Sequence, residues 1–310
     1  MLLGLAGFGV AILIMAGVST LPTGTSDQRQ IAAIYAQYGN RMPPTAMFAS
    51  RVFTGDPDEP AVDCASILGP RTMVALVFGQ SNAANTVEPG YAATQPVFAF
   101  HDGQCRKIHD SVPGASDVMG SSWSRLGDRL IAAGRYDKAL FIDIARGGAS
   151  MLNWGPKGDL HALLLGTLDK LREQDITPTH VLFHQGEADC SIDVPADIYK
   201  VLLETVIGEV RSRLGENVDI YISRTSLHQD FGCPDRQNPD CYKSCPAIVA
   251  AQTGLADPAR RIFSGPNTDQ LVPWFDRRDG YHFTAQGADR FAAAWIPLLA
   301  HDEMPPQSLK

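Results

Sequence analysis

The sequence has no run of basic residues longer than two, with pairs such as Arg260-Arg261 and Arg277-Arg278. Its 34 acidic residues outnumber its 26 basic residues, and the formal net charge is −8. Nucleic-acid-binding surfaces and polybasic membrane patches need clustered positive charge, so we expect no nucleic-acid partner. No repeat with a period of about 20–50 residues is present, which excludes solenoid folds. An apolar content of 45% is enough for a large core and excludes whole-chain disorder.

The cysteines lack the spacing of a metal or redox motif, because there is no CxxC pair and no histidine at zinc-ligand spacing. Their even number, behind an apolar N-terminus, favours up to three disulfides formed in an oxidising compartment. Buried free thiols are the alternative. Of the roughly fifteen pairings that six cysteines allow, we expect Cys64–Cys105, and Cys190 with a partner from the group Cys233, Cys241 and Cys245.

The N-terminal segment lacks charge, since the first charged side chain is Asp27. Its apolar run is long enough to span a bilayer, which takes about 20 residues. We interpret residues 1–24 as a signal peptide or a retained signal anchor, with a buried core helix as the alternative. The protein is therefore expected to be exported, and either secreted or anchored in a membrane. Residues 25–62, rich in Pro, Thr, Gly and Asp, are predicted to form a linker or stalk with one short helix at Gln30–Tyr38.

Residues 63–305 alternate apolar runs with amphipathic stretches, which predicts one α/β domain with a central parallel sheet and helices on both faces. In such sheets, ligands bind beyond the carboxyl ends of the strands. The predicted strands are Thr72–Phe78, Ala139–Ile144, His180–Phe183, Asp219–Ser223 and Arg261–Ser264. The predicted helices are Ser122–Ala133, Leu160–Gln174, Ala196–Leu214, Pro246–Leu255 and Ala285–Ala300.

Two of the segments beyond the strands contain a potential nucleophile and a potential base. Gly79-Gln80-Ser81-Asn82 follows the first strand, where a serine hydroxyl is well placed to attack a ligand. Near the C-terminus, Asp279 lies three residues before His282, so its carboxylate can hold the imidazole Nδ1–H and leave Nε2 free. A helix-capping serine and a surface histidine are the alternative readings of these two segments taken singly.

Two further segments offer hydrogen-bond donors for a developing oxyanion. Gly147 and Gly148 follow the second strand and present unobstructed backbone N–H groups, and Gln185 follows the third strand with a side-chain amide. Glu187 and Asp189 come next, but this segment holds too few ligands for a metal site. Each segment alone is equally consistent with an ordinary loop. Together, in this order and each at a strand end, they predict an active site.

The segments Gly79-Gln80-Ser81-Asn82, His184-Gln185-Gly186-Glu187-Ala188-Asp189 and Asp279-Gly280-Tyr281-His282 resemble the SGNH hydrolase superfamily. Within it they are most similar to the branch of sialate O-acetylesterases and plant-type acetylxylan esterases. This resemblance implies a flavodoxin-like three-layer α/β/α sandwich and a serine esterase that removes O-acetyl groups from carbohydrate through an acetyl-enzyme, without a metal or organic cofactor. Residues 63–305 would then be the catalytic domain.

The resemblance also implies a role for each matching residue. Ser81 would be the nucleophile, His282 the general base and Asp279 its orienting partner. The oxyanion hole would combine the N–H of Ser81, the N–H of Gly147 or Gly148, and the side chain of Gln185, while Glu187 and Asp189 would support the loop. Two alternatives stay open from the sequence. One is an exported polysaccharide O-acetyltransferase with the same triad, and the other is a non-catalytic carbohydrate-binding protein on the same fold.

Overall fold

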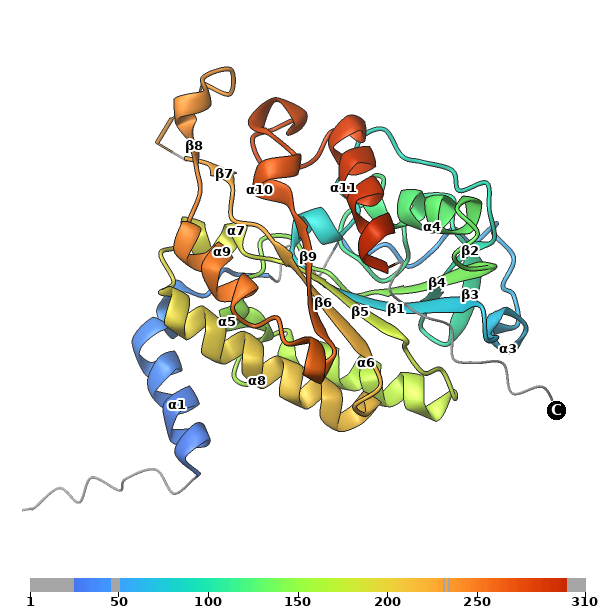
Figure 1. Ribbon diagram of the computed structural model, residues 1–310, viewed down its shortest axis with the longest axis horizontal. Coiled ribbons are helices and arrows are strands. Elements are labelled where there is room, and N and C mark those ends of the chain that lie inside the picture. Colours follow the sequence, from blue (N-terminus) through green and yellow to red (C-terminus); the bar gives the residue numbers. More distant parts are fainter. Residues whose placement is uncertain (1–24, 46–50, 231, 234, 300–310) are drawn as a thin grey trace, which may run out of the picture.

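A computed structural model describes residues 25–45, 51–230, 232, 233 and 235–299. It contains a central seven-stranded sheet with helices packed on both faces (Figure 1). The predicted three-layer α/β/α architecture is therefore confirmed. The segment 1–24, interpreted as a signal peptide or anchor, lies outside the described residues.

The secondary-structure elements follow the predicted alternation of strands and helices. The strands are β1 (Thr72–Gly79), β2 (Val97–His101), β3 (Gln104–Lys107), β4 (Lys138–Asp143), β5 (His180–His184), β6 (Asp219–Arg224), β7 (His228–Gln229), β8 (Tyr242–Lys243) and β9 (Ile262–Asn267). The helices are α1 (Ser26–Tyr38), α3 (Cys64–Ile67), α4 (Ser122–Ala132), α5 (Met151–Trp154), α6 (His161–Glu173), α7 (Glu187–Ser191), α8 (Ala196–Leu214), α9 (Pro246–Thr253), α10 (Thr268–Leu271) and α11 (Ala285–Leu298).

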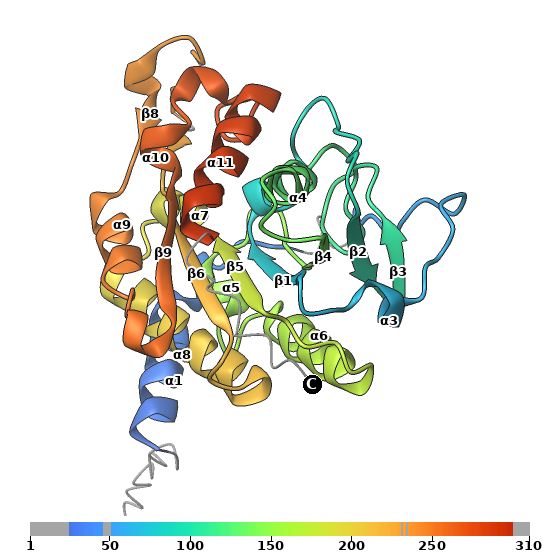
Figure 2. The same ribbon diagram turned by 45° about the vertical axis from the view of Figure 1, so that its right-hand side comes forward.

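The strand order of the main sheet is β3-β2-β4-β1-β5-β6-β9. The five strands from β4 to β9 are parallel and have the order 2-1-3-4-5 of a flavodoxin-like sheet. The hairpin β2–β3 extends the sheet beyond β4, at the end opposite β9 (Figure 2). This hairpin is absent from the sequence-based expectation, and β3 is antiparallel to its neighbour. The topological switch point lies between β1 and β5, where the chain reverses its direction across the sheet.

Strand β1 is buried along its whole length because helices cover both faces of the sheet. Its side chains alternate between two apolar cores: Val74, Leu76 and Phe78 belong to one, and Met73 and Val77 to the other. Helices α5, α6, α8 and α9 contribute to the first core, and α4 and α11 to the second (Figures 1 and 2). These two cores hold β1 and β5 rigidly, and with them the residues at their carboxyl ends.

Within residues 25–62, helix α1 packs onto the domain. Ile31 and Ile34 are buried in the first core, and the Tyr35 hydroxyl donates a hydrogen bond of 2.8 Å to the carbonyl oxygen of Leu152. The division of the chain at residues 24, 62 and 305 stays a prediction. None of the helices between residues 25 and 299 that the structure describes is long and apolar enough to cross a membrane.

The six cysteines form three disulfides, Cys64–Cys105, Cys190–Cys245 and Cys233–Cys241. The predicted pair Cys64–Cys105 is confirmed, and so is the pairing of Cys190 with a member of the C-terminal group. The alternative of free thiols is wrong, because no cysteine is left unpaired. The second disulfide links α7, directly after β5, to the start of α9.

Candidate active site

The candidate site lies at the switch point, where the chain leaves β1 and β5. Gly79 ends β1 with φ +143°, and a Cβ atom there would lie 2.0 Å from the carbonyl oxygen of His184 in β5. Only glycine allows this close approach of the two backbones. The strand ends are thereby held together, and the next residues of both strands share one edge of the sheet.

Ser81 begins a short 3₁₀ turn, Ser81–Ala83, immediately after β1. Its carbonyl oxygen accepts hydrogen bonds from Ala84 N and Thr86 Oγ1, at 3.0 and 2.8 Å. Neither its backbone N–H nor its Oγ makes a hydrogen bond with another described residue. Both groups are therefore available to a ligand in the adjacent pocket.

The side chain of Gln80 connects this turn to the segment after β5. Its Oε1 accepts hydrogen bonds from the backbone N–H groups of Gly186 and Ala188, at 3.2 and 3.0 Å. Those N–H groups lie at the start of α7. The first N–H groups of a helix have no carbonyl acceptor within the helix, so they need an acceptor from elsewhere. Gln80 thus caps α7 and fixes its position relative to Ser81.

Asn82 connects the same turn to the C-terminal segment. Its Nδ2 donates to the Tyr281 carbonyl oxygen at 3.1 Å and to Glu187 Oε1 at 2.9 Å, and its Oδ1 accepts from Phe283 N at 3.2 Å. The residues on both sides of His282 are therefore bonded to the residue that follows Ser81. Asn82 is buried, with 2% of its surface exposed.

Asp279 and His282 form the predicted pair. Asp279 Oδ2 lies 2.6 Å from His282 Nδ1, and its Oδ1 accepts from the backbone N–H groups of Tyr281 and His282. Burial alone would raise the pKa of Asp279, but the hydrogen bonds and charge of His282 hold it well below its ordinary value. An ionised carboxylate can only accept, so Nδ1 carries a proton, and in the neutral imidazole that leaves the lone pair on Nε2. Nε2 makes no hydrogen bond within the described residues.

A pocket of about 560 Å³ brings most of the predicted residues together. It is lined by Ser81, Gly147, Gly148, Glu187, Asp279 and His282, among others. Gln185 and Asp189 do not line it, and both are fully buried.

The two glycines after β4 differ in the hydrogen bonding of their N–H groups. Gly147 N donates to Ser116 Oγ at 2.9 Å, whereas Gly148 N has no acceptor among the described residues. Gly148 also has φ +67°, a conformation that glycine adopts without strain. Both glycines line the pocket, and of the two only Gly148 has an N–H without an acceptor among the described residues.

The amide of Gln185 is occupied inside the protein. Its Nε2 donates to Asp189 Oδ2, to Ala149 O at 3.1 Å and to Gln80 Oε1 at 3.3 Å. Asp189 also accepts from Met151 N at 3.0 Å. Burial raises the pKa of Asp189 to about 7. To stabilise an oxyanion, Gln185 would have to leave these three acceptors.

Glu187 sits in a buried charged cluster under the pocket. His184 Nε2 lies 3.5 Å from Glu187 Oε1, and both side chains are at most 2% exposed. Burial would raise the pKa of Glu187, but His184, Arg277 and the Asn82 hydrogen bond lower it to about 2. Glu187 is therefore ionised, and its hydrogen bond from Asn82 links it to the Ser81 turn. Among the described residues, no group of three or more His, Cys, Asp or Glu side chains could hold a metal ion.

The connecting roles of Gln80 and Asn82 are missing from the sequence-based analysis. Both residues stand within the Gly79–Asn82 segment, beside Ser81. Polar side chains in a buried turn need hydrogen-bond partners. This requirement is the signal that could have predicted hydrogen bonds from Gln80 and Asn82 to neighbouring loops.

Residues 121–253 match the family model described as a carbohydrate esterase, sialic acid-specific acetylesterase. The match confirms the resemblance predicted from the sequence and the enzyme class, a hydrolase acting on ester bonds. It spans Gly147, Gly148 and the segment after β5, but neither Ser81 nor the Asp279–His282 pair. No curated protein sequence matches the chain.

Solved structures with the same fold are similar at low sequence identity. A protein from Arabidopsis thaliana has a TM-score of 0.58 at 13% identity, over 76% of this chain and 99% of that chain. A carbohydrate acetylesterase from Xanthomonas citri has a TM-score of 0.49 at 16% identity, over 72% of this chain and 55% of that chain. A carbohydrate acetylesterase family member from Sinorhizobium meliloti has a TM-score of 0.46 at 16% identity, over 73% and 97%. Identities this low show the fold alone, and of these three only the first has a TM-score above 0.5.

Proposed function

We propose that this protein is a serine esterase that removes O-acetyl groups from carbohydrate, with Ser81 as nucleophile, His282 as general base and Asp279 as its orienting partner. The observation that carries the proposal is the 2.6 Å contact between Asp279 and His282, on the wall of the same pocket as the unbonded Ser81 Oγ. The choice of an acetylated carbohydrate as substrate rests on the description of the matching family, a carbohydrate esterase and sialic acid-specific acetylesterase.

The reaction proceeds in two halves. His282 Nε2 takes the Ser81 hydroxyl proton while Oγ attacks the acetyl carbonyl carbon. The bond to the sugar oxygen breaks, the imidazolium gives its proton to that oxygen, and the acetyl group remains on Ser81. Water then gives a proton to His282 while its oxygen bonds to the acetyl carbon, the bond from that carbon to Ser81 Oγ breaks, and the imidazolium returns the proton to Oγ. Acetic acid leaves and ionises to acetate in solution.

The negative charge that develops on the carbonyl oxygen needs preorganised donors. The backbone N–H groups of Ser81 and Gly148 both lack an acceptor within the described chain and belong to residues that line the pocket. We assign the oxyanion hole to these two groups. Gln185 is not included in the oxyanion hole, because its amide N–H groups already donate hydrogen bonds inside the protein, where the side chain supports the neighbouring segments. Loss of one such donor typically costs about 10²–10³ in rate.

The test is hydrolysis of p-nitrophenyl acetate beside p-nitrophenyl butyrate by the protein produced in an oxidising host. We expect faster hydrolysis of the acetate and nearly complete loss of activity in Ser81→Ala. Ser191→Ala is the matched control, because Ser191 lines the same pocket but its hydroxyl donates to Ala188 O at 2.8 Å. Equal activity of Ser81→Ala and Ser191→Ala would contradict the proposal.

The reaction is proposed to take place outside the cytoplasm. Three disulfides among six cysteines are typical of an oxidising compartment and support export. In this proposal residues 1–24 act as the export signal, either cleaved or retained as an anchor. Mass spectrometry of the exported protein tests this directly, since a cleaved signal removes the N-terminal peptide and an anchor keeps it.

A further inference from the structure

A second pocket adjoins the candidate active site on the other side of the turn Asp117–Met119. Its volume is about 350 Å³, within the range of about 300–1,000 Å³ common for small-molecule sites. Asp117 and Met119 line the active-site pocket, and Val118 between them lines the second one. Likewise, Arg51 lines the active-site pocket and Phe53 lines the second pocket. The two pockets therefore share one wall.

This wall is held by backbone pairing. Asp117 N donates to Arg51 O at 2.9 Å, Phe53 N donates to Ala115 O at 3.0 Å, and a β-bridge joins Val52 to Ser116. Paired backbone is stiff compared with a free loop, so the spacing between the pockets is fixed. A ligand that occupies both pockets has to cross this wall.

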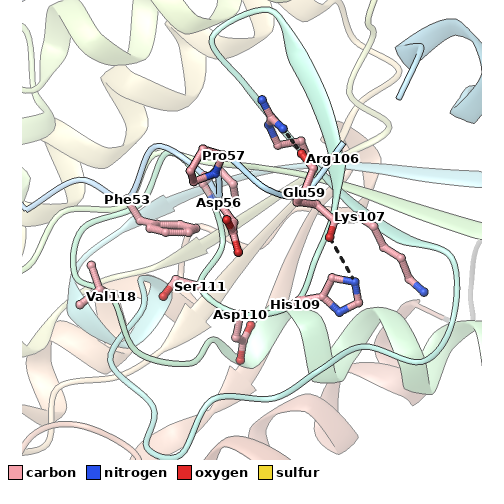
Figure 3. Close-up of a pocket in the computed structure, with 12 residues that line it drawn as sticks. Phe53, Asp56, Pro57, Glu59, Arg106, Lys107, His109, Asp110, Ser111 and Val118 are labelled. Carbon is pink, nitrogen blue, oxygen red and sulfur yellow. Dashed lines mark hydrogen bonds and ion pairs between the residues drawn. The ribbon is translucent and has the colours of Figure 1, made fainter. Parts of the chain in front are cut away.

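The second pocket has an apolar side and a charged side (Figure 3). Phe53 and Val118 lie together on one side, and Glu59, Lys107 and His109 lie on the other. His109 Nε2 is 3.6 Å from Glu59 Oε2. A sugar ring has an apolar face that packs against aromatic or aliphatic side chains, and hydroxyls at its edge that need polar partners.

Acidic and basic side chains both line this pocket. The carboxyl groups of Asp56, Glu59 and Asp110 line it together with the cations Arg106 and Lys107. Sugar hydroxyls donate to carboxylates and accept from cations, so they use both kinds of group. A lining with both signs favours a neutral sugar over an anionic or cationic ligand.

The wall between the pockets exposes apolar side chains. Val118 is 70% exposed and Met119 39%, and they are two of the three large apolar side chains most exposed in the described chain. Adjacent exposed apolar groups between two pockets are suited to contact with a ligand.

We propose that the second pocket binds a neutral sugar next to the acetylated one, so that the substrate is an oligosaccharide or polysaccharide that lies across the Asp117–Met119 turn. This inference rests on the proposed esterase function. In this inference the second pocket makes the enzyme prefer longer substrates, whereas the ester bond is cleaved in the active-site pocket.

The experiment measures kcat/KM against chain length. The probes are chemically O-acetylated xylo-, manno- and chito-oligosaccharides of one to six sugars, with p-nitrophenyl acetate as the substrate that reaches only the active-site pocket. For the wild-type protein we expect kcat/KM to rise about tenfold between one sugar and longer chains in at least one series, equivalent to about 1.4 kcal/mol.

Two variants test the second pocket, and one serves as control. Val118→Ser and Lys107→Ala should remove the rise with chain length and leave hydrolysis of p-nitrophenyl acetate unchanged. Phe275→Ser, which alters another exposed apolar side chain (60% exposed) outside both pockets, should keep the rise. Circular dichroism of each variant confirms folding, and Val118 and Lys107 are tested separately so that one misfolded variant does not decide the outcome.

The outcomes separate this inference from the proposed function. Failure of the wild-type protein to hydrolyse p-nitrophenyl acetate contradicts the esterase itself. Hydrolysis of that ester with equal kcat/KM at all chain lengths in all three series overturns the second pocket alone. The same conclusion follows when the rise is present but folded Val118→Ser and Lys107→Ala both retain it.

Discussion

Replacement of Asn82 by alanine tests whether the hydrogen bonds from the Ser81 turn position the proposed base. The change removes three hydrogen bonds, to Tyr281 O, Phe283 N and the ionised Glu187. A buried hydrogen bond contributes about 0.5–1.5 kcal/mol, and one to a charged group about 1.5–3 kcal/mol. We therefore expect Asn82→Ala to lower the free energy of unfolding by about 2.5–6 kcal/mol.

The effect on catalysis should come through His282. Two of the three bonds hold the residues on either side of His282, so their loss lets the imidazole move relative to Ser81. Misplacement of a catalytic group by about 1 Å can cost about 10² in rate. We expect kcat for p-nitrophenyl acetate to fall by about 10², with KM little changed. Stopped-flow or steady-state kinetics at a temperature well below the unfolding midpoint measures this.

The matched control is Asn153→Ala. Asn153 is also fully buried, and its side chain bonds to Pro43 O, Asp159 and Ser150 instead of to the proposed triad segments. It should lose stability to a similar degree while kcat stays within about threefold of the wild-type value. If Asn82→Ala loses stability but keeps its kcat, Asn82 does not position His282 and the reasoning is refuted.

Three further predictions follow from the same contacts. Gly148→Ala should reduce kcat more than Gly147→Ala, because only Gly148 has a positive φ and an N–H without an acceptor among the described residues; equal losses would leave the two glycines undistinguished and contradict the assignment. Burial raises the pKa of Asp189 from 3.8 to about 7, so the folded protein binds more protons than the unfolded chain in this window. Stability should then fall as the pH rises from about 4 to about 7, and urea midpoints of Asp189→Asn should lack that slope. The double variant Cys190→Ser/Cys245→Ser should lose about 4 kcal/mol, the loop-closure value for a separation of 55 residues, while an unchanged denaturation midpoint would show that the link contributes nothing.

The parallel part of the sheet could be predicted because its strands are continuous apolar runs. All eight residues of β1 are buried, so both faces need apolar side chains and the run stands out in the sequence. The hairpin β2–β3 was harder to predict from the sequence, since its strands are short and β3 is mostly polar. Its turn residues Asp102 and Gly103 have φ +48° and +83°, and an Asp-Gly pair between two short strands is a recognised hairpin signal.

The site could be predicted at the level of segments, but not of individual donors. The sequence places Gln185 directly after a strand, yet which side of the turn its amide faces depends on packing against Ala149 and Asp189. The choice between Gly147 and Gly148 likewise depends on Ser116, which is 31 residues away in the chain. Long-range contacts of this kind leave no local pattern, so only the folded structure separates the candidates.

The hydrogen bond between Asn82 and Phe283 joins positions 201 residues apart. Ribosomes add about 5–20 residues per second, so about 10–40 s separate the synthesis of Ser81 from that of His282. During that interval the first strand and Ser81 exist without the proposed base. Because the segment of His282 joins the site so late, the proposed esterase activity requires nearly the whole domain to be complete. The time at which this activity appears would then measure the time of folding after synthesis or export.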